Sequence, residues 1–237
     1  MTLVKGVAFD SWRRVGSVIQ AVKVYNMRDV DELIFEDITA SIENRRPDFN
    51  LVDDFADECF MPLTVGGGIK TIDDIKRLLN VGADKVSINS ASISNPELIK
   101  EASAIFGAQC IVVSIDVKFN NNKYEVFSNA GKTPTGIDAL SHAKNMEKSG
   151  AGEILLTSID SDGSMNGYCL DIIRNISKNI SIPLIASGGA GNYNHILDVL
   201  KINGVDAAAA ASIFHFTEQT PIEAKQYLKK NGIPVRV

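Results

Sequence analysis

The chain has 237 residues, of which 45% are hydrophobic and 22% charged, and its formal net charge is −5. The acidic balance, without a cluster of lysines and arginines, argues against a nucleic-acid-binding surface. No apolar run is long enough to span a membrane, the polar N-terminus does not resemble a signal peptide, and the three cysteines are far apart. We therefore expect a cytoplasmic globular protein with buried free thiols.

Short apolar, strand-like runs alternate with amphipathic helical stretches along the chain. The strand-like runs cover residues 32–38, 61–66, 85–89, 109–117, 153–159, 182–187 and 206–212. Most of them are continuously apolar, which is typical of parallel strands that are covered on both faces. Repeated β-then-α units predict an α/β fold, either an open doubly wound sheet or a (β/α)8 barrel.

An internal repeat favours the barrel. Pro62 and Pro183 begin similar phrases, "PLTVGGGI" and "PLIASGGA", at an offset of 183 − 62 = 121 residues. After one inserted residue the offset becomes 122, which relates Asp84 to Asp206. Two half-barrels of four β/α units close naturally into one eight-fold barrel. We predict a single TIM-barrel domain over residues 1–237, built from two half-barrel repeats.

The same repeat predicts that the first barrel strand is missing from this chain. The counterpart of Asp116 would lie at position −5, before Met1, and residues 2–9 match residues 123–131, which follow a strand. A barrel without its first strand has open edges and an exposed core. We expect a misplaced start or a truncated gene.

Glycine clusters follow two strands that are equivalent in the repeat, and the next strand in each half ends in a polar residue. Loops after barrel strands form the active-site face, where phosphate commonly binds to backbone N–H groups. The alternative is that these glycines only form tight turns. Because the cluster occurs twice, we predict two phosphate sites on opposite sides of one mouth and a ligand with a phosphate at each end. The residues involved are Gly67, Gly68, Asn89 and Ser90 in one half, and Gly188, Gly189 and Ser212 in the other.

Four aspartates follow strand-like runs and are expected at the same mouth: Asp37, Asp116, Asp160 and Asp162. Carboxylates in that place can transfer protons on a bound substrate, and their mutual repulsion helps to raise a pKa. The alternative is that such an aspartate caps the next helix, and this alternative is strongest for Asp162. The histidines share no metal-ligand spacing, so we expect no metal site.

The ordered phrases "DELIFEDITAS", "PLTVGGGI", "GADKVSIN", "SIDVK", "GAGEILLTSIDSDGSMNGY", "IASGGAG" and "AASIFHF" resemble the cyclase subunit of imidazole glycerol phosphate synthase, from histidine biosynthesis. The resemblance covers essentially the whole chain. It implies a cofactor-free (β/α)8 lyase in a heterodimer with a glutaminase, which supplies ammonia. The implied reaction converts a bisphosphorylated ribulosyl-imidazole carboxamide to imidazole glycerol phosphate and an aminoimidazole carboxamide ribotide.

The resemblance also implies roles for individual residues. Asp116 would be the general acid, Asp162 a second active-site carboxylate, and Lys5 a lysine on a mobile loop. One phosphate would bind to Gly68, Asn89 and Ser90, and the other to Gly163, Gly189 and Ser212. At the opposite end of the barrel, Glu32, Lys85 and Glu153 would form a charged ring that guards an ammonia passage, and Asp84 would face the glutaminase.

The sequence departs from this family pattern in three ways. The family's general-base aspartate and the basic member of its ammonia gate belong to the missing segment, and Glu36 places a charge in an apolar run. The phrases "RRPDFNLVDDFADECFMP" and "KVYNMRDVDELI" resemble a paralogous branch, which amidates surface-polysaccharide sugars with a glutaminase-like partner. Two further alternatives are a catalytically inactive subunit that docks and activates a glutaminase, and a phosphosugar isomerase on the related repeat. The isomerase alternative leaves the charged ring unexplained.

Overall fold

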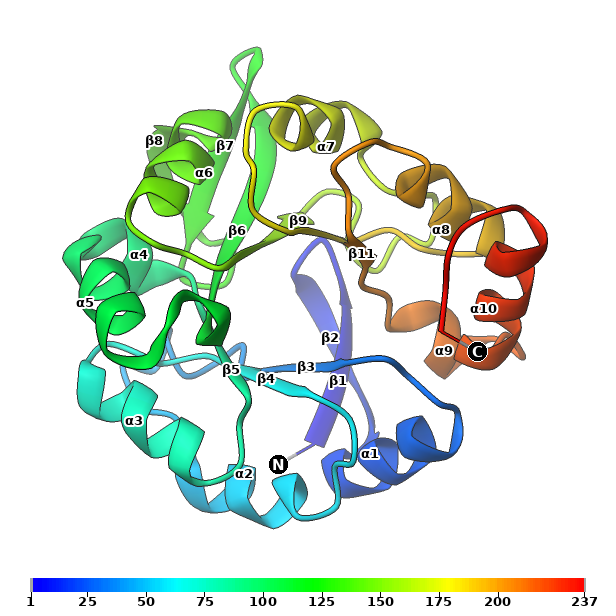
Figure 1. Cartoon of the computed structure of the whole chain (residues 1–237), viewed down its shortest axis with the longest axis horizontal. Coiled ribbons are helices and arrows are strands. Elements are labelled where there is room, and N and C mark those ends of the chain that lie inside the picture. The colour runs from blue at the N-terminus through cyan, green and yellow to red at the C-terminus, as the bar shows by residue number, and fades with distance from the viewer. Residues whose placement is uncertain (1, 237) are drawn as a thin grey trace.

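The computed structural model describes residues 2–236. These residues form a ring of parallel strands enclosed by helices (Figure 1). Seven strands form one curled sheet in the order β11-β10-β9-β6-β5-β4-β3, and all their pairings are parallel. These strands are β3 (Leu33–Glu36), β4 (Leu63–Gly66), β5 (Lys85–Ile88), β6 (Ile111–Asn120), β9 (Glu153–Ser158), β10 (Leu184–Ser187) and β11 (Ala207–Ala208). The architecture confirms the prediction of an α/β fold of the TIM-barrel type.

Helices pack around the outside of the ring. They are α1 (Val18–Met27), α2 (Phe49–Ala56), α3 (Ile72–Asn80), α4 (Ser90–Ser94), α5 (Glu97–Phe106), α6 (Ala139–Lys148), α7 (Leu170–Ser177), α8 (Tyr193–Leu200), α9 (Ser212–Phe216) and α10 (Pro221–Lys230), with a short 3-10 turn η1 (Ala108–Cys110). Capping boxes begin α3, through Thr71 and Asp74, and α10, through Thr220 and Glu223. Among residues 2–236, none of the helices combines the length and the apolar character needed to cross a bilayer.

The ring is open between β3 and β11. Each of these strands has a hydrogen-bonded neighbour on one side only among the described residues. The opening lies where the repeat places the first barrel strand. The predicted strand 206–212 is reduced to β11, because this edge segment pairs with β10 alone and hydrogen bonding ends after Ala209 N–H donates to the Ala186 carbonyl over 2.8 Å.

Two antiparallel hairpins confirm the predicted relation between residues 2–9 and 123–131. β1 (Thr2–Val7) pairs with β2 (Asp10–Ser17), and β7 (Lys123–Ser128) pairs with β6 and with β8 (Thr133–Asp138). The tip of the β1–β2 hairpin is held by Ala8 N–H, which donates to the Asp162 carbonyl over 2.9 Å. The hairpin therefore reaches the loop that follows β9.

Side chains alternate along the strands between the helical layer and the interior of the ring. The main apolar core lies between strands and helices and includes Val86, Ile111, Val113, Ile154 and Leu184. A much smaller apolar cluster lies on the inner face of the ring, where Val112, Leu155 and Ile185 pack with Ile34, Ala207 and Ala209. Polar residues lie above and below this inner cluster, and they define the two ends of the candidate site.

The three thiols are free, but they are half-buried, and the prediction that they would be buried was wrong. Cys59 donates to the Met61 carbonyl over 3.4 Å, and Cys169 lies 3.3 Å from the Tyr124 hydroxyl. Both contacts lie near the outer surface of the ring, where strands and helices do not cover the sulfur completely.

Candidate functional site

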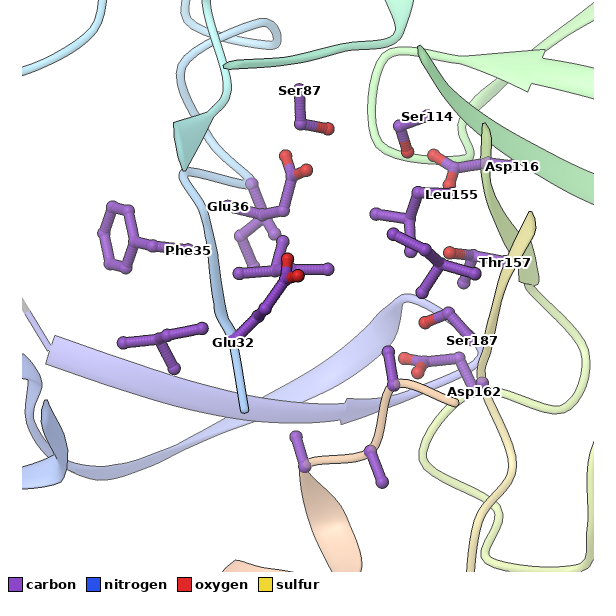
Figure 2. A pocket seen from close by; sticks show the side chains of 18 of the residues that line it. Glu32, Phe35, Glu36, Ser87, Ser114, Asp116, Leu155, Thr157, Asp162 and Ser187 are labelled. Atoms are coloured by element: carbon purple, nitrogen blue, oxygen red, sulfur yellow. The ribbon is translucent and has the colours of Figure 1, made fainter. Parts of the chain in front are cut away.

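A cavity of about 1540 Å³ occupies the inside of the curled sheet and continues through the opening between β3 and β11 to the helices α1, α8 and α10. It extends from the carboxyl ends of the strands to their amino ends, where Glu32 and Glu153 line it. Ten predicted site residues line its other end: Gly67, Gly68, Asn89, Ser90, Asp116, Asp162, Gly163, Gly188, Gly189 and Ser212. Figure 2 shows side chains of β3 and β5 on one wall and those of β6, β9 and β10 on the facing wall. The structure thus brings together residues that are far apart in the sequence.

Asp116 lies on β6 and points into this cavity (Figure 2). Its carboxylate accepts a hydrogen bond from Asn89 Nδ2 over 2.7 Å, and 8% of the residue is exposed. Burial raises the pKa of Asp116 well above its ordinary value, the negative charges of Glu36 and Asp162 raise it further, and the bond from Asn89 opposes the effect only in part. The raised pKa favours the protonated, neutral form of Asp116 compared with an exposed aspartate, which suits this carboxyl group to donate a proton.

Asp162 follows β9 and lines the same cavity. Burial raises its pKa, while the backbone N–H of Gly163 and the positive charge of Lys5 act in the opposite direction. The next helix, α7, has Cys169 as its N-cap residue, so Asp162 does not cap it. The capping alternative does not apply to this residue.

Lys5 projects from β1 near the mouth of the cavity. Its Nζ lies 4.6 Å from the centre of the Phe216 ring and 3.9 Å from Met165 Sδ. Arg13 lies on the same ring, 4.5 Å from its centre. The Lys5 ammonium is held by cation–π contact, close enough to Asp162 to influence its titration.

The glycine turns lie at the ends of β4 and β10, on opposite sides of the ring. Gly68 has a φ of +76°, and a Cβ there would lie 2.6 Å from the Arg45 carbonyl oxygen. Gly189 has a φ of +112°, and a Cβ there would lie 2.7 Å from the carbonyl carbon of Gly167. The protein's own backbone therefore requires glycine at both positions, so the tight-turn interpretation accounts for the residue type. Their position around one cavity is the evidence that remains for phosphate binding.

The other two strand-end aspartates have structural partners. Asp37 accepts hydrogen bonds from Arg45 Nη1 over 2.8 Å and from the backbone N–H of Thr39 over 3.1 Å. Burial favours the neutral form of Asp37, but the bonds from Arg45 and Thr39 outweigh burial and lower its pKa. Asp160 pairs with Lys118 over 3.5 Å and is half-exposed. Neither is arranged to donate a proton to a ligand, although Asp37 lines the cavity as expected.

A partly exposed ion-pair group lies at the opposite end of the cavity. Lys85 Nζ donates to Glu32 Oε2 over 2.9 Å and to Glu153 Oε1 over 2.6 Å. Burial opposes the charge of Lys85, but the hydrogen bonds that it donates to Glu153 and Glu32 outweigh this effect and raise the Lys85 pKa. The three charges compensate one another, which explains how they are accommodated below the inner apolar cluster.

Asp84 has a structural role at the start of β5. Its Oδ2 accepts a hydrogen bond from Leu63 N–H over 2.8 Å, and in the other half Asp206 Oδ2 accepts from Leu184 N–H over 3.0 Å. This pairing of equivalent bonds accounts for the repeated aspartate. It leaves one oxygen of Asp84 on the exposed face.

Glu36 is a site residue that the sequence interpretation missed. Glu36 ends β3 and lies four residues after Glu32, which directly precedes this strand, so both face the interior, and the carboxyl group of Glu36 points into the cavity (Figure 2). Protein surrounds this side chain, although the cavity leaves it accessible to water. Burial raises the pKa of Glu36 to about 7, the Ser87 hydroxyl opposes this effect, and the charge of Asp37 adds to it. The sequence signal for this position was the alternation of side chains along a strand, which places Glu36 on the same face as Glu32.

A curled parallel sheet enclosed by helices, with glycine turns and carboxyl groups at the strand ends, defines this chain as a barrel of the TIM type. A family model described as "Histidine biosynthesis protein" matches residues 1–220. The chain belongs to this family of histidine-biosynthesis barrels, whose enzymes are of the isomerase and cyclase type.

Proposed function

We propose that this chain is an ammonia-using cyclase subunit of the imidazole glycerol phosphate synthase type. In this proposal a glutaminase supplies ammonia, and the barrel converts a bisphosphorylated ribulosyl-imidazole carboxamide to imidazole glycerol phosphate and an aminoimidazole carboxamide ribotide. The observation that carries the proposal is one continuous cavity with different chemistry at its two ends. Asp116, whose pKa is raised, lies between two glycine turns at one end, and the Lys85 ion-pair group lies at the other.

The mouth of the cavity suits a ligand with two phosphates. Gly67–Gly68 and Gly188–Gly189 follow strands on opposite sides of the ring, and Ser90 and Ser212 begin the short helices that follow the adjacent strands. Backbone N–H groups and hydroxyl groups at these positions would bind phosphate oxygens. A ligand held at both ends would place its central atoms beside Asp116.

The chemistry needs proton transfer at these central atoms. Ammonia that bonds to carbon becomes a cationic nitrogen and must lose a proton, whereas the nitrogen that leaves in the cleavage must gain one. Asp116, with its raised pKa, is suited to supply a proton to the leaving nitrogen. Asp162 and Lys5 would assist at the mouth, where the hairpin that carries Lys5 contacts the loop after β9.

The ion-pair group supports an ammonia path from a partner. Glu32 and Glu153 line the cavity, and Lys85 links them. A glutaminase bound at this end, near the exposed Asp84, would release ammonia next to the ring of charges. Movement of Lys85 away from either glutamate would open the passage into the cavity.

The proposal is tested by incubating the chain with the bisphosphorylated substrate and ammonium at alkaline pH, and measuring both products by chromatography. We expect ammonium-dependent formation of the two products in equal amounts. Asp116→Asn should abolish this turnover and leave substrate affinity largely intact, because it removes a proton donor and keeps the shape of the side chain. A tenfold loss of affinity with normal turnover would contradict the role of Asp116.

The alternatives predict other results in the same assay. A sugar-amidation subunit or an inactive docking subunit would stimulate a glutaminase without consuming this substrate. An isomerase would convert its phosphosugar without ammonium. Failure of ammonium-dependent turnover in the parent chain would therefore reject the cyclase proposal, and the glutaminase assay would separate the remaining candidates.

A further inference from the structure

Glu36, Gly66 and Ser87 form a row across three neighbouring strands. β3 pairs Glu36 with Gly66 of β4, and β4 pairs Gly66 with Ser87 of β5. Because Gly66 has no side chain, the carboxyl group of Glu36 extends over it toward Ser87 (Figure 2). A Cβ at Gly66 would lie 2.6 Å from Glu36 Cδ, so any other residue at this position would displace the carboxyl group.

The Ser87 hydroxyl group, at the end of this row, interacts with Glu36 and lowers its pKa, but makes no hydrogen bond of good geometry within the part of the chain that the structure describes. Ser87 is 2% exposed and lines the cavity, and its Oγ has no hydrogen-bond partner of normal geometry among the described residues. Asn89 Oδ1, which is two residues further along the chain, is also buried and unpaired among residues 2–236. Buried polar atoms are almost always satisfied, and unpaired ones at a cavity wall point to a bound ligand.

Glu36 faces Asp116 across the cavity (Figure 2). The charge of Glu36 is the largest electrostatic contribution to the raised pKa of Asp116, so the two carboxyl groups influence each other. The other charged groups around Glu36 are Asp37, which Arg45 binds, and Asp162 with Lys5 at the mouth. When Glu36 is ionised, its charge helps to keep the proton on Asp116, so that one group is ready to accept a proton while the other is ready to donate.

We propose that Glu36 is a second catalytic residue of this cavity, which contacts the ligand between the two glycine turns and accepts a proton there. The inference rests on the proposed function. The incoming ammonia nitrogen bonds to the ketone carbon of the substrate and gives two protons to the carbonyl oxygen, which leaves as water. When this nitrogen then bonds to the second carbon and closes the ring, it passes its remaining proton to the Glu36 carboxylate, and the Asp116 carboxyl gives one proton to the nitrogen whose bond to that carbon breaks. Exchange with solvent returns both carboxyl groups to their starting states. Ser87 and Asn89 supply the hydrogen bonds that hold the ligand beside Glu36.

The first experiment measures the titration of both carboxyl groups without any ligand. The full chain is labelled with ¹³C at the side-chain carboxyl groups of glutamate and aspartate, and Glu36→Gln and Asp116→Asn identify the two resonances. We expect the Glu36 resonance to titrate near pH 7, as burial of its carboxyl group requires. In Glu36→Gln the pKa of Asp116 should fall, whereas the exposed control Glu101→Gln should leave it unchanged. An ordinary titration of Glu36 between about pH 4 and 5 would overturn the inference.

The second experiment measures turnover of the bisphosphorylated substrate, with the concentration of free ammonia held constant at each pH. Wild-type turnover should fall on the acid side with an apparent pKa near 7. Glu36→Gln should lower kcat by about 100-fold and remove this acid limb, with KM changed less than about threefold. Glu36→Asp should recover part of the rate, and Glu101→Gln should match wild type. A Glu36→Gln enzyme that keeps a third of the wild-type kcat with the same acid limb would refute the proposal.

The two experiments separate this inference from the proposed function. If the wild-type chain does not consume the substrate, the cyclase proposal fails, and the titration decides whether Glu36 is a proton-exchanging group coupled to Asp116. If the wild-type chain is active and Glu36→Gln is equally active, the cyclase proposal stands and the role of Glu36 is rejected.

Discussion

Replacing Glu36 with glutamine should stabilise the fold at alkaline pH. A carboxyl group whose pKa is raised in the folded state binds more protons there than in the unfolded chain, so its contribution to stability is present at low pH and is lost as the pH rises. The window runs from the ordinary value of 4.5 to the folded value of about 7. Above this window the wild-type protein keeps an ionised carboxylate inside the ring, and Glu36→Gln removes that charge without changing the size of the side chain.

The size of the effect follows from the two pKa values. The difference between about 7 and 4.5 corresponds to about 3.4 kcal/mol as an upper limit. Water in the cavity reaches Glu36 and screens its charge, so the realised effect must be smaller. We expect Glu36→Gln to raise the free energy of unfolding by about 1–2 kcal/mol at pH 8 and to leave it nearly unchanged at pH 4.

Urea unfolding followed by far-UV circular dichroism would measure this difference. Circular dichroism is preferable to tryptophan fluorescence, because Trp12 lies on the β1–β2 hairpin and reports on that hairpin. Glu101→Gln, an exposed change on α5, should show no comparable difference between the two pH values. If Glu36→Gln were as stable as wild type at pH 8, or less stable, the carboxyl group would not be held in a charge-disfavouring environment.

Three further predictions concern the two ends of the cavity. Lys85→Met should lower stability by about 2 kcal/mol, between the values for exposed and buried pairs, because Glu153 is 17% exposed and loses its partner. The double variant Lys85→Met/Glu153→Gln should recover most of this loss in the same urea assay, and no recovery would show that the charge of Glu153 is not the cause. Ser212→Asp should weaken binding of the bisphosphorylated substrate by about tenfold, as measured by calorimetry, because the new carboxylate repels a phosphate. The control Gln226→Glu, on the outer helix α10, should not change this affinity. If Ser212→Asp bound the substrate as tightly as wild type, the result would argue against a phosphate at Ser212.

Most of the architecture could be predicted from the sequence, because its signals are local and repeated. Continuous apolar runs located the seven parallel strands, and the offset between Pro62 and Pro183 related the two halves. The match between residues 2–9 and 123–131 predicted the missing first strand and therefore the opening of the ring. The extent of β11 could not be predicted, because an alanine-rich segment has the same pattern whether or not a neighbouring strand is available to pair with it.

The roles of individual polar residues were harder to predict, because they depend on partners that are distant in the sequence. Asp37 and Asp116 both end strand-like runs, yet Arg45 binds one and Asn89 contacts the other, so their pKa values move in opposite directions. Asp84, which recurs in the repeat, matched the family's residue that faces the glutaminase, but its side chain also accepts a hydrogen bond from the backbone N–H of Leu63. Strand position therefore predicted which end of the barrel each residue occupies, but not whether its charge is free to act.

The glycines show why a recurring motif can mislead a mutational test. Gly189 has a positive φ and no room for a Cβ beside Gly167, so Gly189→Val would distort the turn whether or not a phosphate binds there. A loss of binding in that variant would not distinguish the two explanations, whereas an added charge at Ser212 changes the electrostatics and keeps the backbone. The same reasoning applies to Gly66, whose missing side chain makes room for the carboxyl group of Glu36. A glycine next to the cavity therefore indicates function only through the group that occupies the space above it, and above Gly66 that group is the titratable carboxyl group of Glu36.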